Sequence, residues 1–213
     1  MMINRWSRAL FCLPMCMVCS SILSAQVTWQ AVSMRVNNEP MSKLRAVGIP
    51  AEAEFKGQKL KAFVFFYGRE GQGGGIGYPN FGIYVEDIES IVPESEIGLF
   101  VGPDLSRVAV DNDAIKISIG RGDSQESMST RLVYTGTQYF DTGFKTDGFF
   151  ETNIRRTKNA TDAWKHFLTE MGGGFEDGKA VIGGKAFSNE LTVRFPGKGL
   201  SARLKELMVY CNN

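Results

Sequence analysis

The sequence is poor in the side chains that most catalytic and metal sites need. Among its 213 residues it has one histidine, His166, and four cysteines, three of which (Cys12, Cys16 and Cys19) lie in the first 25 positions. Zinc, copper and haem sites, and nucleophile triads such as Ser-His-Asp, require histidines or cysteines gathered in one place. The Gly-x-Ser-x-Gly motif of serine hydrolases is also absent. These absences exclude the usual metal centres and nucleophilic hydrolases, and we expect no cofactor.

The chain also lacks an excess of charge of either sign. Its 24 Lys and Arg residues stand against 23 Asp and Glu residues, which leaves a formal net charge of +1. Dedicated nucleic-acid binders carry a strong basic excess, so we expect no nucleic-acid partner. Hydrophobic residues make up 43% of the chain and charged residues 22%, and 15 Phe and 6 Tyr are available to build the core of a globular domain.

The first 25 residues have the pattern of a secretory signal peptide. Arg5 and Arg8 precede the apolar run Leu10–Val18, and Ala25 ends the segment as the last residue before a cleavage site. The apolar run is shorter than the roughly 20 residues that a membrane-spanning helix needs. An uncleaved anchor and a lipoprotein attached through Cys19 are the alternatives. The sequence therefore predicts an exported protein, periplasmic or secreted, whose mature chain has no membrane span.

The mature chain is expected to consist mostly of β-strands. The second half of Leu60–Tyr67 is apolar on both faces, which is typical of a central strand covered on both sides. Lys56–Lys59 before it carries a hairpin signal, and a change of phase within Val27–Val36 indicates a β-bulge. In chain order the expected strands are Val27–Val36, Ala51–Phe55, Leu60–Tyr67, Ile83–Ile91, Ile97–Val101, Arg107–Val110, Ala114–Ile119, Arg131–Tyr134, Gln138–Phe140, Phe149–Ile154 and Leu191–Phe195.

Two helices are expected near the carboxyl end. Apolar residues recur at helical spacing through Ala160–Met171, with Asn159 as the cap. A second apolar stripe predicts a helix over Ser201–Tyr210 that turns Cys211 toward the core, where its thiol would be inert. The sequence therefore predicts one α+β domain, mainly β, over residues 26–213. We expect an antiparallel β-sandwich or a barrel-like sheet with two helices near the C-terminus.

The most distinctive segment is Gly68–Gly82, GREGQGGGIGYPNFG, in which seven residues are glycine. Its glycines do not match the spacing of nucleotide-binding loops, and no helix pattern follows. Two interpretations remain: a flexible connection between two strands, or a binding loop held by a rigid sheet. Aromatic rings and an amide suit sugar stacking or protein contact. The candidate ligand-binding residues are Arg69, Tyr78, Asn80 and Phe81.

Acidic residues leave room for one other chemistry. Glycoside hydrolysis needs only two carboxyl groups at a suitable separation, and Glu86, Asp87 and Glu89, or Asp111 and Asp113, are candidate pairs. At turns and strand edges, however, acids usually serve solubility and turn formation. The segment after Asp113 lacks the third oxygen ligand and the glycine that an EF-hand calcium loop requires.

Three short features have plainer explanations than a functional site. His166 falls opposite the apolar stripe of its helix, so we expect it to be solvated. Arg121-Gly122-Asp123 spells an adhesion tripeptide, but in a glycine-containing turn such a match is most often chance. Asn159-Ala160-Thr161 is a glycosylation acceptor only in a eukaryotic secretory route, and helix capping explains Asn159 without it.

The carboxyl-terminal quarter resembles a known family. Phe167–Gly173 ends a helix, Asn189–Phe195 is an expected strand, and Gly199–Leu207 begins the final helix. This succession is similar to the ending of small bacterial envelope proteins of the invasion-associated locus B type and of related type VI secretion accessory proteins. The resemblance implies a β-sandwich with a non-enzymatic periplasmic role, and it transfers no catalytic residues to this chain.

The function expected from the sequence is binding without catalysis. An exported module would contact an envelope or extracellular glycan or protein through the Gly68–Gly82 loop. One alternative is a carboxylate-dependent hydrolase that acts on an envelope or extracellular polymer. The other is a structural or assembly protein of the envelope, which would self-associate.

Overall fold

The computed structural model describes residues 28–36, 39–40, 44–70, 77–87, 108–109, 115–136, 138–140, 148–154, 156–183 and 189–213. The expected leader, the strand Ile97–Val101 and the acids Asp111 and Asp113 lie outside these residues. In the described part of the chain, neither helix is long and apolar enough to cross a membrane.

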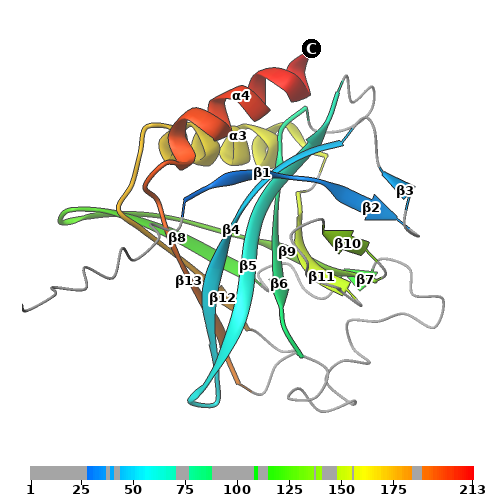
Figure 1. The fold of residues 1–213 in the computed structure, drawn as a ribbon. Coiled ribbons are helices and arrows are strands. Elements are labelled where there is room, and N and C mark those ends of the chain that lie inside the picture. Colours follow the sequence, from blue (N-terminus) through cyan, green and yellow to red (C-terminus); the bar gives the residue numbers. More distant parts are fainter. Residues whose placement is uncertain are drawn as a thin grey trace, which may run out of the picture.

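The described residues form an antiparallel, barrel-like sheet with two helices (Figure 1). The strands are β1 (Gln30–Val32), β2 (Met34–Val36), β3 (Glu39–Pro40), β4 (Leu44–Phe55), β5 (Gln58–Arg69), β6 (Asn80–Val85), β7 (Val108–Ala109), β8 (Ile115–Arg121), β9 (Ser124–Gly136), β10 (Gln138–Phe140), β11 (Gly148–Asn153), β12 (Asp177–Ile182) and β13 (Leu191–Pro196). The helices are α3 (Lys158–Gly172) and α4 (Leu200–Asn212). The predicted mainly β fold with two helices near the C-terminus is confirmed.

The ring of strands closes through β4. In order around the ring, β4, β13, β12, β8, β9, β11, β6 and β5 are each hydrogen-bonded to the next, and β5 pairs with β4 along its full length. β1 pairs with the other edge of β4, beyond β13, and β2, β3 and β10 form a small separate sheet. Of the two architectures expected from the sequence, the barrel-like sheet is the one observed.

The hairpin of β4 and β5 is longer than its sequence pattern indicated. Lys56 and Gly57 form its two-residue turn, both with positive φ (51° and 76°), as such turns require. The strands extend past the expected limits to Leu44 and Arg69, which face each other at the far end. Gly48 hid this extension because it interrupts the apolar pattern. It is needed there because a side chain would overlap the Phe63 ring.

Two other expected strands were wrong in extent, and two further strand segments were not expected. Ile83–Ile91 was expected as one strand, but β6 ends at Val85 because the chain turns at Asp87, which has a φ of 54°. The continuous strand expected over Val27–Val36 is two strands that belong to different sheets. β12 and the first half of β9 were not expected at all, because their polar and glycine-containing sequences lack a clear alternation.

One continuous core fills the inside of the sheet and extends under the helices, which cover one end of it (Figure 1). Of the predicted apolar stripe of α3, Trp164, Phe167, Leu168 and Met171 are buried, whereas Ala163 is exposed. The expected cap was wrong: α3 begins at Lys158, and the Thr157 side chain accepts a hydrogen bond from the Ala160 N–H at 3.4 Å. Thr157 is extended (φ −109°, ψ 148°), which is the conformation of an N-cap residue, whereas Asn159 is inside the helix. The predicted burial of Cys211 on α4 is confirmed.

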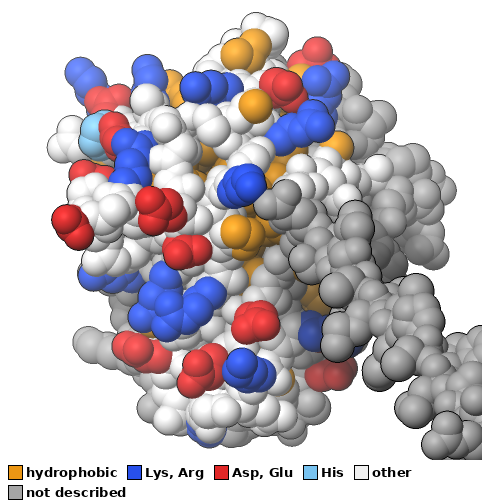
Figure 2. Space-filling view, turned by 60° about the vertical axis from the view of Figure 1, so that its left-hand side comes forward, with side chains coloured by type: hydrophobic (Ala, Val, Ile, Leu, Met, Phe, Trp, Pro, Cys, Tyr) orange, Lys and Arg blue, Asp and Glu red, His pale blue; other side chains and the backbone are white. Residues whose placement is uncertain are grey.

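The outside of the sheet is divided into a polar part and an aromatic part. Across β5, β4, β13 and β12, the opposed residues Lys61, Glu52, Arg194 and Lys179 form a row of charged side chains. Figure 2 shows acidic and basic side chains interspersed over one face of the molecule. On the other part, the strand predicted to be covered on both sides is buried on both sides. Its outward residues belong to an outer aromatic cluster made of Val32, Ala46, Phe63, Phe65, Tyr67 and Tyr84.

Candidate functional site

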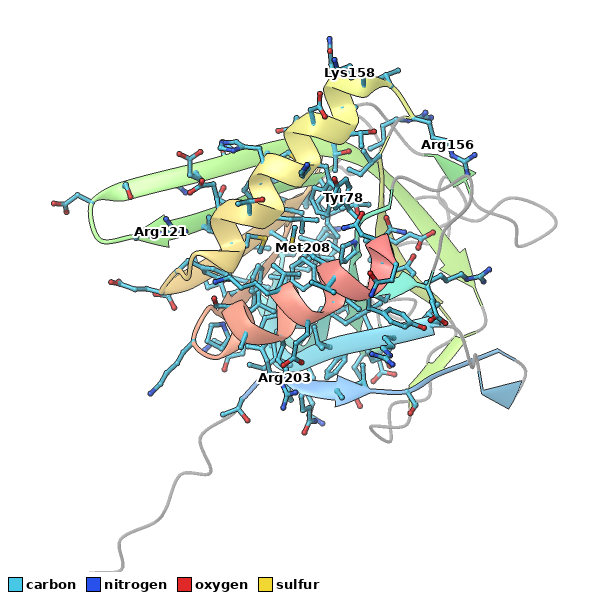
Figure 3. The ribbon with its side chains drawn as sticks, turned by 90° about the horizontal axis from the view of Figure 1, so that it is seen from above. Tyr78, Arg121, Arg156, Lys158, Arg203 and Met208 are labelled. Atoms are coloured by element: carbon cyan, nitrogen blue, oxygen red, sulfur yellow. The ribbon has the colours of Figure 1, made fainter. Side chains whose placement is uncertain are left out.

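The end of the glycine-rich segment lies between the two helices. Residues 71–76 lie outside the described part of the chain, and Gly77 to Pro79 lead into β6. The end of α3 lies beside the start of α4, where the Ser201 hydroxyl donates to the Gly172 carbonyl. Figure 3 shows Tyr78 and Met208 in the space between the helices. We call this surface the helix notch and define it as Gly77, Tyr78, Lys165, Met208 and Asn212.

The backbone that carries Tyr78 is held by a hydrogen bond from a buried tryptophan. The Trp164 indole N–H donates to the Pro79 carbonyl at 2.8 Å, and Trp164 has no exposed surface. Gly77 adopts a φ of 70°, and a Cβ there would lie 3.3 Å from the Asn212 Oδ1 atom. This φ favours glycine, which lets the chain pass close to the end of α4 without a side chain. The aromatic residue at the end of a glycine-rich segment is therefore fixed in place.

The side chain of Tyr78 is shared between the core and the surface. It is half-buried and packs against the core cluster, as does Met208 of α4. The Lys165 ammonium of α3 lies 5.7 Å from the centre of the Tyr78 ring, within the range of a cation–π contact. The notch thus combines two partly exposed apolar side chains with a positive charge.

The structure separates the four residues that the sequence grouped as one site. Phe81 has no exposed surface, and its ring lies 5.1 Å from Phe66 and 5.7 Å from Phe195, so it is a core residue. Asn80 faces outward, where its amide donates to the Tyr67 hydroxyl at 3.4 Å. Arg69 is exposed at the end of β5, on the same outward face as Tyr67. Of the four, only Tyr78 lies at the helices.

Of the acids that the sequence singled out, Glu86 and Asp87 lie in the described part of the chain, and they do not form a buried pair. Glu86 makes an ion pair with Lys61 at 3.3 Å on the surface, and Asp87 occupies the turn after β6, while Glu89 lies outside the described residues. No group of three His, Cys, Asp or Glu side chains in the described ranges could hold a metal ion. These placements give no support to a two-carboxylate site among the residues whose positions are described.

Sequence reasoning missed the acid with the most unusual environment, Glu151 on β11. It is 4% exposed, and burial raises its pKa to about 7. Its neighbour across the pair of strands is Gly82, over which the Phe65 ring lies, so the carboxyl group adjoins the outer aromatic cluster. Arg131 of β9, whose Nε is buried, shares this outward face. In the sequence Glu151 stands between Phe150 and Thr152, and this context gives no sign that its carboxyl group is buried.

The adhesion-like tripeptide is a structural turn. Gly122 (φ 54°) and Asp123 connect β8 to β9, and the Arg121 guanidinium donates to the backbone carbonyls of Glu170 and Gly174 at the end of α3. A cation at the last carbonyls of a helix stabilises that end. Arg121 is therefore engaged within the protein. His166 is exposed, as the sequence predicted.

Replacing Trp164 with phenylalanine should loosen Tyr78. The variant keeps a core ring but removes the donor to the Pro79 carbonyl, and we expect stability to fall by about 1–2 kcal/mol. A fluorinated tyrosine at position 78, observed by NMR, should show increased ring motion. Trp29→Phe is the matched control, since Trp29 makes an equivalent 2.8 Å hydrogen bond to the Pro196 carbonyl. It should lose similar stability and leave residue 78 unchanged; equal loosening in both variants would contradict the anchoring role of Trp164.

Comparison with protein-family models, with curated proteins and with solved structures found no match to this chain. The resemblance of its carboxyl-terminal quarter to the invasion-associated locus B family stays a prediction.

Proposed function

We propose that this protein is an exported, non-catalytic binding module that contacts a protein of the cell envelope or extracellular space through the helix notch. The observation that carries the proposal is the placement of Tyr78, a half-exposed aromatic side chain on a backbone anchored by Trp164. Anchoring lowers the entropy lost on binding, and tyrosine is among the residues that contribute most at protein interfaces.

Two details favour a protein over a glycan as the partner. Sugar stacking uses the open face of an aromatic ring. One face of the Tyr78 ring is occupied by the Lys165 ammonium, which lies over it at 5.7 Å from the ring centre. A protein partner needs a ring edge, apolar neighbours and a charged rim, which Met208 and Lys165 supply. Val209, the residue after Met208, is 61% exposed and extends the apolar surface along α4.

The test is site-specific crosslinking in cells of the source organism. A photoreactive amino acid in place of Lys165 should yield a discrete crosslinked protein, whereas the same group in place of Lys116, exposed on β8, should not. Adding Tyr78→Ala should remove the crosslink. Phe81, which the sequence grouped with Tyr78, is unsuitable for such a test because it is a core residue.

A methionine pair provides a further control. Met208→Ala should weaken the crosslink several-fold, and Met128→Ala should not, although both methionines are partly buried against the same core. If position 165 yields only a glycan adduct, or the same pattern as position 116, the assignment of a protein partner to the notch is wrong.

A further inference from the structure

The hairpin of β8 and β9 presents an edge of the sheet. β9 has two edges. On one edge, β8 pairs with Ser124–Thr130, and β7 pairs further along the same edge. On the other edge, β11 pairs with β9 only from Arg131 onward. Within the described ranges, no strand pairs with that second edge of Ser124–Thr130. Figure 3 shows the hairpin projecting from the body of the molecule, with β9 on its outer side.

The backbone groups of this edge alternate in direction. Gly122 and Asp123 form a two-residue turn, which makes Arg121 and Ser124 a hydrogen-bonded pair. Along an antiparallel ladder every second residue then directs its N–H and C=O groups to β8, and the residues between direct theirs away. Gln125, Ser127 and Ser129 therefore present their backbone groups to the outer side.

The edge lacks most of the features that usually prevent another strand from pairing with it, although Glu126 places one charge on the same face of the sheet as its partner Ile119. Natural edges are protected by lysine, proline, bulges, very short strands, charges on the inward face, or a covering helix or loop. Ser124–Thr130 contains neither lysine nor proline, pairs with β8 in continuous register, and carries a single charge, at Glu126. Its residues from Ser124 to Ser127 are exposed. Such an edge is a surface for strand addition.

We propose that two copies of this protein associate by antiparallel pairing of their β9 edges about a two-fold axis at Ser127. Ser127 is the midpoint of Ser124–Thr130, so this axis uses the longest stretch of the edge. Gln125 then pairs with Ser129 of the second copy, and Ser127 pairs with itself, each pair exchanging two backbone hydrogen bonds. Hydroxyl and amide side chains face one another across the strands, a favourable combination.

Charge favours a two-fold axis at Ser127 over one at Glu126. With the axis at Ser127, the one charged residue of the edge, Glu126, lies opposite Met128 of the second copy. An axis at Glu126 would place the two carboxylates directly opposite each other, which is destabilising. The edge is therefore self-complementary in one arrangement, as a closed two-fold interface requires. This surface is separate from the helix notch, so the inference does not depend on the proposed function.

The first test measures mass and register on the mature chain. Light scattering should give twice the mass of one chain at high concentration and the monomer on dilution. Ser127→Cys should form an intermolecular disulfide on oxidation, because hydrogen-bonded residues on paired strands lie about 5.5 Å apart between Cα atoms, within disulfide range. Gln125→Cys is the matched control: its own copy lies about four residues away along the strand, so it should not crosslink alone.

A mixture of Gln125→Cys and Ser129→Cys proteins should crosslink as a heterodimer. Ser127→Pro should be monomeric while keeping its thermal midpoint, since proline is tolerated at an edge where the N–H faces away from the sheet. A monomeric wild type, a dimeric folded Ser127→Pro variant, or equal crosslinking of the Gln125→Cys and Ser127→Cys proteins would each overturn the proposal. A wild-type monomer whose edge instead captures a strand of another protein would also overturn it.

Discussion

Replacing Phe195 with alanine is expected to destabilise the protein by about 3–5 kcal/mol. Phe195 is 2% exposed and lies at the centre of the core, with its ring 5.7 Å from Phe81, 6.1 Å from Phe175 and 6.2 Å from Trp29. Truncation removes the buried surface of the ring and the contacts of three neighbouring rings. Because single domains have total stabilities of about 5–15 kcal/mol, the variant should be near its unfolding threshold.

Denaturant unfolding of the mature chain measures this loss. Val209→Ala, at a side chain that is 61% exposed, is the control and should change stability by less than about 0.5 kcal/mol. A loss below about 1.5 kcal/mol for Phe195→Ala would show that the core collapses around the site or that the ring is not central to it.

Gly178 allows the same contact to be tested from the other strand. It lies opposite Phe195 on β12, and a Cβ at that position would overlap the Phe195 ring. Gly178→Ala should therefore destabilise the wild type, but it should be neutral or stabilising when Phe195 is already alanine. In the double-mutant cycle, the double variant should lose clearly less stability than the sum of the losses of the two single variants. Additive effects would contradict the packing of the ring over the glycine.

The second large effect is the pH dependence that Glu151 should confer on stability. Its pKa is raised by burial from 4.5 to about 7 in the folded protein. The folded state therefore holds its proton more tightly than the unfolded state. This contribution is fully present below pH 4.5 and is lost as the pH rises through 7, with a span of about 3 kcal/mol at 1.36 kcal/mol per pH unit.

The Glu151→Gln variant isolates the contribution of Glu151 ionisation to stability, because glutamine does not titrate. The difference in unfolding free energy between Glu151→Gln and wild type should shift by about 3 kcal/mol in favour of the variant between pH 4 and pH 8. Because the comparison uses the change of this difference between the two pH values, any packing effect of the amide that does not depend on pH cancels. Glu54→Gln, the same substitution at an exposed position of β4, keeps Glu151 and should keep the wild-type slope. A constant difference across this pH range would disprove the buried ionisation.

The helices and the central hairpin were predictable because their signals are local. The spacing of Trp164, Leu168 and Met171 reflects the geometry of a single helix, and the alternation around Lys56 and Gly57 reflects a single hairpin. Strands whose stability comes from neighbours distant in sequence were not recognised. Ser124–Thr130 is polar throughout, and it is a strand because β8 pairs with it in register.

The candidate site shows the same division. Composition alone identified Tyr78 and its glycine-rich segment as unusual, but adjacency in sequence wrongly placed Phe81 with it. Alternation along β6 sends Phe81 to the core and Asn80 to the outer face. Glu151 was overlooked because a carboxylate in sequence carries no mark of its burial. Only the pairing of β11 with β6 places it beside Gly82 and the Phe65 ring.

The sequence by itself determined the class of fold, the two helical stripes, the buried cysteine and the scarcity of histidine and cysteine. Each of these depends on composition or on periodicity within one element. Tertiary structure alone decided that the sheet closes through β4 and β5, that Tyr78 is anchored between the helices, and that Glu151 is buried. It also decided that one side of Ser124–Thr130 in β9 has no partner strand among the described residues. These properties depend on which strands become neighbours, and many local patterns are compatible with more than one such arrangement.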